Sequence, residues 1–497
     1  MTETVNIKAT RREWMALAIL ILPTLIVSMD MNVTYLALPV LSAALKPTSA
    51  ELLWITDIYG FLEAGLLIVM GSLGDKFGIR KMLLLGATAF SVSSVFAVFA
   101  PSAFWLIIAR AVMGIGGAAI LPAVISLIRN MFRDDHQRTF AVGMYTTAFS
   151  AGSMIGPVAG GFLLYHFWWG SIFLMPVPLI LLLLFTAPVL LPEFKNNSAH
   201  PFDLFSAGLL IASALLTIFG IKQIAQNGFT LPYVVSIIAG ITLGFIFIRR
   251  QKILPEPLID LQLFGNPVFR IAIAALFIVL FDCCGMALFS GQYLQSVIGL
   301  NTFQAGLWLL PGPIGSVILC LLAPVAAKHF ERTTIIAAGL TTMALSVLIF
   351  VFIGMHDIIL LGIANFLMTA GGAVTVTIGI DTVVASAPHH KAGAAAGISE
   401  TSTGFGGALG VAILGSIWTA LYRGKMMPFA SPTDEARNTI GGAIAEAKRL
   451  NNISLLTHAK DAFVSSMHVT AGVCAAIIAV VIVFVVSMRR AGIAAAE

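Results

Sequence analysis

The sequence predicts an all-α protein that crosses a membrane many times. Of its 497 residues 59% are hydrophobic and only 10% are charged, and its mean hydropathy is +0.98. Soluble domains carry about 25% charged residues, so this composition excludes an ordinary soluble protein. The excess of basic residues does not indicate nucleic-acid binding, because these residues stand singly and in pairs between apolar runs.

Fourteen apolar runs are long enough to span a bilayer, which takes about 20 helical residues. Charged residues, Gly and Pro separate these runs. The predicted spans are 14–38, 51–72, 82–100, 104–128, 139–162, 170–191, 203–224, 232–249, 269–293, 304–327, 334–354, 358–384, 393–418 and 467–488. The first run contains Asp30 and is too long for a cleavable signal, so we expect it to be a span.

The distribution of basic residues predicts the orientation. Most of the 28 lysines and arginines fall in loops that are cytoplasmic if the N-terminus is inside, whereas the short outer loops carry only Lys46 and Lys222. Loops enriched in Lys and Arg stay in the cytoplasm. We therefore expect a multi-pass protein of the bacterial plasma (inner) membrane with both termini in the cytoplasm.

The spans divide into three predicted units. Residues 1–195 form an N-terminal six-helix bundle, 196–255 a two-helix linker, and 256–497 a C-terminal six-helix bundle with a long outer loop, 419–466. A weak repeat supports duplicated halves, because Ala323–Arg332 repeats the basic spacing of Gly71–Arg80. Within the long loop, one short helix is expected from Thr433 toward Arg449 and another over 454–464.

Six carboxylates fall inside predicted spans: Asp30, Asp57, Glu63, Asp282, Asp381 and Glu400. A charge at the bilayer centre costs roughly 3 kcal/mol on insertion scales, so such residues are normally retained for function. Several of them together indicate a polar path through the membrane. They predict transport of something cationic, with protons involved.

Three charged residues share one depth in the outer half. At 1.5 Å per residue, Asp30, Asp57 and Arg110 lie about 9–12 Å from the outer ends of their helices. A neighbouring arginine favours the ionised carboxylate and burial favours the protonated one, so a balance between them suits reversible protonation. We predict that Asp30, Asp57 and Arg110 couple transport to protons. The alternative for Asp30 and Arg110 is a permanent structural ion pair.

Deeper acids are candidates for contact with the substrate. Glu63 lies near the midplane beside Tyr59 and Phe61, on the same helix as Trp54, and aromatic faces attract cations. Asp282 has a similar place in the other half, and Glu400 lies about 10 Å from the cytoplasmic end of its helix. The alternative for Glu63 and Asp282 is a neutral structural acid. Asp381 lies near a helix end, where we expect solvation at the interface.

Several motifs together resemble the major facilitator superfamily, and in particular its fourteen-helix drug:proton antiporters of the QacA/SmvA type. The segments that carry the resemblance are Asp30–Pro39, Trp54–Tyr59, Gly71–Arg80, Arg110–Gly114 and the glycine-rich run Gly152–Gly161. The resemblance implies the major facilitator fold, with two extra helices between two six-helix bundles. It also implies a gate that includes Gly71, Asp75 and Arg80, and an antiporter motif that includes Gly156 and Pro157.

The resemblance further implies a monomeric, proton-driven exporter of lipophilic, cationic drugs and biocides such as quaternary ammonium compounds, dyes and biguanides. One alternative is an exporter of a neutral or anionic metabolite or antibiotic that uses the acids for protons only. Another is a sensor or channel that transports nothing. No Walker loop or catalytic motif occurs, so we expect a transporter and not an enzyme, with no cofactor, no metal site and the proton gradient as energy source.

Overall fold

The computed structural model describes residues 8–494, except 46, 48, 196–202, 228, 256, 260, 301, 389–391 and 429–439. Within these ranges the secondary structure is helical, with no strand. Thirteen helical segments are long and apolar enough to cross a membrane, and a shorter apolar helix covers Phe205–Ile221. The predicted all-α polytopic fold is confirmed.

The N-terminal half, as the term is used below, consists of helices α1 to α7. The pairs α1–α5, α2–α4 and α3–α4 pack most extensively, and α6 and α7 together form a single span, Ser171–Leu190. The helices are α1 (Arg11–Leu45), α2 (Ser49–Phe77), α3 (Ile79–Val98), α4 (Ala103–Met131), α5 (Asp135–His166), α6 (Ser171–Leu174) and α7 (Pro176–Leu190).

A helical hairpin of α8 (Leu204–Asn227) and α9 (Leu231–Gln251) follows in the chain. Helix α8 packs against α2 and α15, and α9 packs against α8. Most side chains of α9 are not buried by protein, which fits a helix that faces lipid.

The C-terminal half consists of helices α10 to α18. The pairs α10–α15 and α13–α14 pack most extensively, and α11 and α12 lie within one span, Gln304–Ala326. The elements are η1 (Leu261–Gly265), α10 (Pro267–Gln292), the π-helical turn η2 (Tyr293–Val297), α11 (Thr302–Leu309), α12 (Pro311–Ala326), α13 (Arg332–Phe350), α14 (Ile358–Ser386), α15 (Ala392–Met426), α17 (Ile440–Arg449) and α18 (Ile453–Ala494).

The long loop predicted over 419–466 is in large part helical. Helix α15 continues to Met426 and α18 already begins at Ile453, so the short helix expected over 454–464 is the first part of α18. The other expected helix is present as α17, but its expected start near Thr433 lies outside the described residues. Aromatic stacking supports the longer α15, because the Trp418 and Tyr422 rings are parallel with centroids 5.0 Å apart.

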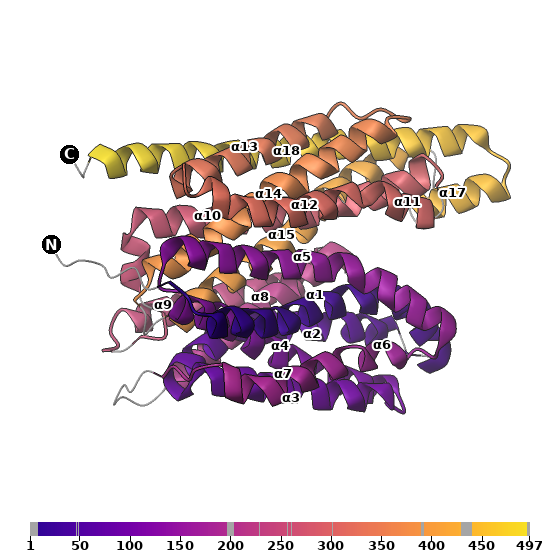
Figure 1. Ribbon diagram of the computed structural model, residues 1–497. Helices are drawn as coiled ribbons and strands as arrows, with labels where there is room; N and C mark the ends of the chain where they lie inside the picture. The colour runs from indigo at the N-terminus through magenta and orange to yellow at the C-terminus, as the bar shows by residue number, and fades with distance from the viewer. Residues whose placement is uncertain are drawn as a thin grey trace.

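The two halves lie side by side along the long dimension of the molecule (Figure 1). Helix α1 begins and α18 ends at the same end, which we call the base; α17 lies at the opposite end, which we call the top (Figure 1). The halves meet where α2 packs against α15 and where α5 packs against α12. Hydrogen bonds between the halves occur from the base up to the level of Ser150 on α5. There the Ser150 Oγ lies 3.3 Å from the Oγ of Ser316 on α12.

Glycines allow the backbones of the two halves to approach closely. A Cβ on Gly397 of α15 would lie 2.8 Å from the carbonyl oxygen of Leu67, and one on Gly143 of α5 would lie 2.7 Å from that of Cys320. Small residues let helices associate in lipid, where no hydrophobic force drives them together. The halves are therefore closed against each other toward the base.

Candidate functional site

Asp30 and Arg110 form a direct ion pair inside the N-terminal half. The Arg110 guanidinium donates from Nη1 to Oδ2 of Asp30, and both side chains are buried. Arg110 Nε also donates to the backbone oxygen of Ile55 at 3.4 Å. The Arg110 Cζ lies over the Tyr59 ring, 4.5 Å from the ring centroid. Helices α1, α2 and α4 are thus joined around one buried cation.

Glu63 lies one turn after Tyr59 on α2. The Tyr59 hydroxyl donates to Oε1 of Glu63 at 3.4 Å, and Glu63 is buried. Two glycines of α4 make room for this pair. A Cβ on Gly114 would lie 2.5 Å from the backbone oxygen of Tyr59, and one on Gly117 would lie 3.0 Å from both the Tyr59 hydroxyl and Glu63 Oε1.

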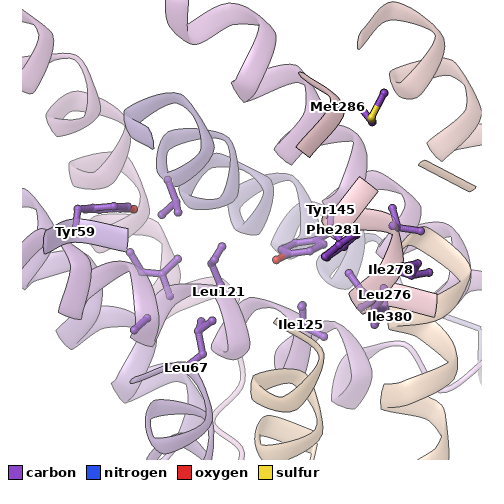
Figure 2. Packing of buried hydrophobic residues seen from close by; sticks show 14 of the residues in the cluster. Tyr59, Leu67, Leu121, Ile125, Tyr145, Leu276, Ile278, Phe281, Met286 and Ile380 are labelled. Carbon is purple, nitrogen blue, oxygen red and sulfur yellow. The ribbon is translucent and has the colours of Figure 1, made fainter. Parts of the chain in front are cut away.

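Glu400 on α15 brings a second carboxylate to the interface from the C-terminal half. Its Oε1 accepts a hydrogen bond from the Tyr145 hydroxyl of α5 at 2.9 Å. In Figure 2 the hydroxyl ends of Tyr59 and Tyr145 point toward the region between them. Glu63 interacts electrostatically with both Glu400 and Asp30. We call Asp30, Glu63 and Glu400 the acid cluster.

The aromatic residues predicted beside Glu63 divide between two faces of α2. Tyr59 contacts the acid cluster, whereas Phe61 packs edge-to-face on Trp54 with centroids 6.0 Å apart. Trp54 in turn stacks on Phe219 of α8 at 6.3 Å. Asp57 lies within α2, but its side chain is outside the described residues.

Asp282 lies apart from the acid cluster, on the side of α10 that faces α18. Its Oδ1 accepts a hydrogen bond from the Sγ of Cys474 at 3.2 Å, and the side chain is fully buried. The structure therefore does not bring Asp282 together with Glu63 and Glu400.

At the base, two of the predicted gate residues, Asp75 and Arg80, bond to different parts of the chain. Oδ2 of Asp75 accepts from the backbone N–H of Ala394 at 3.0 Å, so it caps the N-terminus of α15 across the interface. Arg80 donates to the backbone oxygen of Leu191 at 2.9 Å and pairs with Glu193 at 3.7 Å. Gly71 is buried within α2 and contributes no polar side chain.

Asp381 corrects a sequence-based expectation. We expected solvation at the membrane interface, but Asp381 is fully buried between the halves. It accepts hydrogen bonds from Arg138 Nε and from the Thr139 hydroxyl of α5, both at 2.8 Å, and pairs with Arg332 at 3.1 Å. Arg129 adds contacts of 3.4 Å to the backbone oxygens of Ala385 and Ala387. We call Arg138, Thr139, Arg332 and Asp381 the base lock.

The glycine-rich run of α5 packs against α1. A Cβ on Gly156 would lie 2.9 Å from the backbone oxygen of Met29, directly before Asp30. Pro157 lies within α5, and its side chain is outside the described residues. The run thus positions α5 against the part of α1 that carries Asp30.

A cavity of about 220 Å³ lies at the base between α1, α5 and α12, and its lining includes none of Asp30, Glu63, Asp282, Asp381 and Glu400. In the described part of the chain, no group of three or more His, Cys, Asp or Glu side chains is placed to hold a metal ion.

Several partners in these networks were not predicted as site residues, among them Arg138, Tyr145 and Glu193. Arg138 resembles the other basic residues of the loops, and its partner Asp381 is 243 positions away. Local sequence carries no signal for a pairing at that separation. The sequence signal for Glu193 is only its place just after a predicted span. Its carboxylate lies against Gly78, which has a φ of 117° and no side chain to block it.

Comparisons with known proteins agree with this architecture. A sequence profile of the Major Facilitator Superfamily matches residues 20–411. The multidrug efflux pump LfrA of Mycolicibacterium smegmatis is 39% identical over 488 residues, which cover 96% of this chain and 97% of LfrA. The methyl viologen resistance protein SmvA of Salmonella typhimurium is 32% identical, and the match covers 92% of this chain and 94% of SmvA.

A solved structure supports the fold independently. The human organic anion transporter MFSD10 superimposes with a TM-score of 0.62 over 94% of this chain and 99% of that chain, at 14% sequence identity. At this identity the likeness shows the fold alone. The profile match, the two bacterial relatives and the helical architecture show that the chain belongs to the Major Facilitator Superfamily and is a multi-pass membrane transporter, not an enzyme.

Proposed function

We propose that the protein is a proton-coupled antiporter that exports lipophilic cations, such as quaternary ammonium compounds, dyes and biguanides, from the cytoplasm or inner leaflet. It acts as a monomer in the bacterial inner membrane, with its base and both termini in the cytoplasm. The observation that carries the proposal is the electrostatic interaction of Glu63 with Glu400 from the opposite half and with the Asp30–Arg110 pair. The names of LfrA and SmvA support drug efflux as the class of activity.

The chemistry of the acid cluster suits exchange of a proton for a cation. Glu63 and Glu400 each accept a hydrogen bond from a tyrosine hydroxyl, and neither forms an ion pair in the described part of the chain. Two carboxylates that interact in a mostly apolar site are disfavoured in the doubly ionised form unless a positive charge compensates them. A proton or an organic cation supplies that charge, so the two compete for one site.

The Asp30–Arg110 pair gives the second part of the coupling. While Asp30 is ionised it neutralises Arg110, but protonation of Asp30 leaves a buried cation without its partner. That cation is then free to interact with Glu63, with which it shares electrostatic contact. We infer that protonation of Asp30 changes how strongly Glu63 holds a cationic substrate. A ligand shifts a conformational equilibrium only through such differential affinity.

The test uses purified protein in liposomes with an imposed pH gradient and ethidium or methyl viologen as substrate. Wild-type protein is expected to move the cation against the proton flux. Asp30→Asn is expected to abolish the response to the gradient, since its side chain cannot exchange a proton. Glu63→Gln and Glu400→Gln are each expected to weaken cation binding about tenfold or more, as lost charge pairing of a few kcal/mol implies.

Glu446→Gln is the matched control, because Glu446 lies on α17 and pairs with the exposed Arg449. It is expected to transport like wild type. Cation transport that is unaffected by Asp30→Asn, or that ignores the pH gradient in the wild type, would contradict the proposal. Movement of neutral or anionic compounds in place of cations would favour the alternative in which the acids serve protons only.

A further inference from the structure

Asp282 is a buried acid without any charged or hydroxyl partner in the described part of the chain. Its Oδ1 accepts from the Cys474 thiol, a weak donor, and its Oδ2 is buried with no hydrogen-bond partner. Asp30 and Asp381, by contrast, face arginines, and Glu63 and Glu400 face tyrosine hydroxyls. In the described part of the chain the side chain that contacts Asp282 is the Cys474 thiol, whereas the thiols of the neighbouring Cys283 and Cys284 lie beside Gly372 of α14 and Gly407 of α15.

A polar stripe on α18 leads from Asp282 toward the top. Ser466, Thr470 and Cys474 follow one another at intervals of four residues, so they share one face of the helix, and all three are buried inside the C-terminal half. Helix α18 runs from top to base, which places Ser466 about 12 Å above Cys474. The Ser466 hydroxyl is also buried without a hydrogen-bond partner.

A second polar contact lies at the same height on the facing helices. Ser290 is eight residues after Asp282 on α10, which is about 12 Å closer to the top. Its hydroxyl donates to Oδ1 of Asn365 on α14 at 3.0 Å, and both side chains are buried. The C-terminal half therefore contains polar groups from the level of Ser466 down to Asp282, inside otherwise apolar packing.

The physical chemistry of this arrangement favours the protonated acid. An ionised carboxylate that is fully buried and faces no cation is strongly disfavoured, whereas the neutral acid carries no charge to desolvate. Buried polar groups without a protein partner are usually satisfied by an internal water molecule. Ser466 and Asp282 are the two ends of the stripe with such unpartnered groups, and Thr470 lies between them, its hydroxyl donating to the Ser466 backbone oxygen at 2.9 Å.

We propose that Asp282 is a proton-binding site of the C-terminal half that exchanges its proton with the top side along Ser466, Thr470 and Cys474. It is separate from the acid cluster, so that a full transport cycle carries one proton on Asp282 in addition to those bound by Asp30 and its neighbours. This inference rests on the proposed proton-driven antiport and specifies where a further proton is carried. It replaces the predicted contact between Asp282 and the substrate.

Infrared spectroscopy of the protein in lipid bilayers tests the protonated state directly. Asp282→Asn is expected to remove one carbonyl band of a protonated carboxylic acid that is present at neutral pH. In the wild type this band is expected to shift in heavy water, because the proton exchanges along the stripe. Asp461→Asn, which changes an exposed acid of α18, is the control and is expected to leave the band unchanged.

Two infrared outcomes would overturn the inference. If Asp282→Asn removes no such band, the acid is not protonated; if the band does not shift in heavy water, Asp282 is a sealed structural acid. Should Asp282→Asn fail to fold, Cys474→Ala takes its place. It removes the hydrogen bond that the Asp282 side chain accepts in the described part of the chain, and it is expected to shift the frequency of the same band.

The proton-to-substrate ratio tests the role in transport. The ratio is obtained in liposomes from the pH gradient at which substrate flux reverses, and Asp282→Asn is expected to lower it by one. Ser466→Ala and Thr470→Val are expected to slow proton-driven flux severalfold without changing the ratio. An unchanged ratio in Asp282→Asn refutes the inference. Absence of any pH-driven flux in the wild type would instead refute the proposed antiport, and the infrared result would still decide the protonation of Asp282.

Discussion

Arg138 is the residue on which the base lock depends. Its side chain is only 2% exposed, its Nε donates to Asp381, and its Nη1 pairs with Asp135. Removing one partner of a buried ion pair leaves an uncompensated charge in an apolar site, which typically costs 3–5 kcal/mol. The pair joins α5 to α14, so this energy holds the two halves together at the base.

Asp381→Asn is therefore expected to destabilise the base-closed conformation by about 3 kcal/mol. Thermal unfolding in detergent would show a lower Tm, and distance measurements between spin labels at the base would show a larger separation. Arg332→Ala is the comparison, because Arg332 is 31% exposed and water can replace part of its contact with Asp381. An effect of Asp381→Asn no larger than that of Arg332→Ala would contradict this role.

At the scale of elements, Asp203 fixes the start of the α8–α9 hairpin. It accepts hydrogen bonds from the backbone N–H groups of Phe205 and Ser206, each at 3.1 Å, and pairs with Arg250 at 3.0 Å. Burial alone would raise the pKa of Asp203, but the bonds from Ser206 and the Arg250 guanidinium outweigh it and hold the pKa below its usual value. One side chain thus caps α8 and ties it to the end of α9.

Asp203→Ala is expected to destabilise the hairpin by about 1 kcal/mol, the usual contribution of an N-cap. Because the folded pKa lies below the unfolded one, the contribution is present above the ordinary pKa of aspartate and is lost as pH falls through the folded pKa. Hydrogen exchange of the α8 amides as a function of pH measures this loss. Asp203→Asn keeps the cap, so it is expected to retain part of the protection and to lose the pH dependence; equal protection in all three proteins would argue against the cap.

The contact between α10 and α15 depends on a backbone approach. A Cβ on Gly410 would collide with the carbonyl oxygen of Phe281, directly before Asp282. Gly410→Ala is expected to separate the helices and lower the Tm by several degrees, as an overpacked site costing 1–3 kcal/mol would. A Cβ on Gly424 of the same helix would meet no atom within 4 Å, so Gly424→Ala is expected not to lower the Tm. Equal Tm values for the two variants would show that α15 can move away from α10 without a loss of stability.

At the scale of the whole molecule, the base-closed conformation predicts which residues of the two halves can be linked. The hydroxyls of Thr146 on α5 and Thr377 on α14 are 2.7 Å apart and buried. The halves must separate there when the base opens in an alternating-access cycle.

A double variant with cysteine at positions 146 and 377 is expected to form a disulfide that arrests transport, with recovery after reduction. Each single variant is the control and is expected to transport before and after oxidation. Complete cross-linking together with full transport would show that the halves do not separate at this point.

The fold could be predicted largely from the sequence, but the inter-half contacts could not. Long apolar runs define spans by the bilayer thickness alone, and the shared depth of Asp30 and Arg110 in their helices correctly indicated that the two residues meet. The outer ends of α15 and α18 were not predicted, because their outer turns are too polar to be recognised as parts of a membrane span. Contacts between the two helices stabilise these turns, such as the hydrogen bond from the Trp418 indole to the backbone oxygen of Phe463. Asp381 was placed wrongly for a related reason: depth along a helix does not reveal an arginine from the other half.

The packing of the α8–α9 hairpin makes the two flanks of the transporter unequal. In the described part of the chain the hairpin packs on α2 and α15 through α8 and has no comparable packing with α5 or α12. The α2–α15 seam is therefore covered by an additional pair of helices, whereas the α5–α12 seam is not covered by this hairpin in the described part of the chain. The two lateral openings between the halves are thus expected to differ in access from the bilayer, which makes the transporter asymmetric about its long axis.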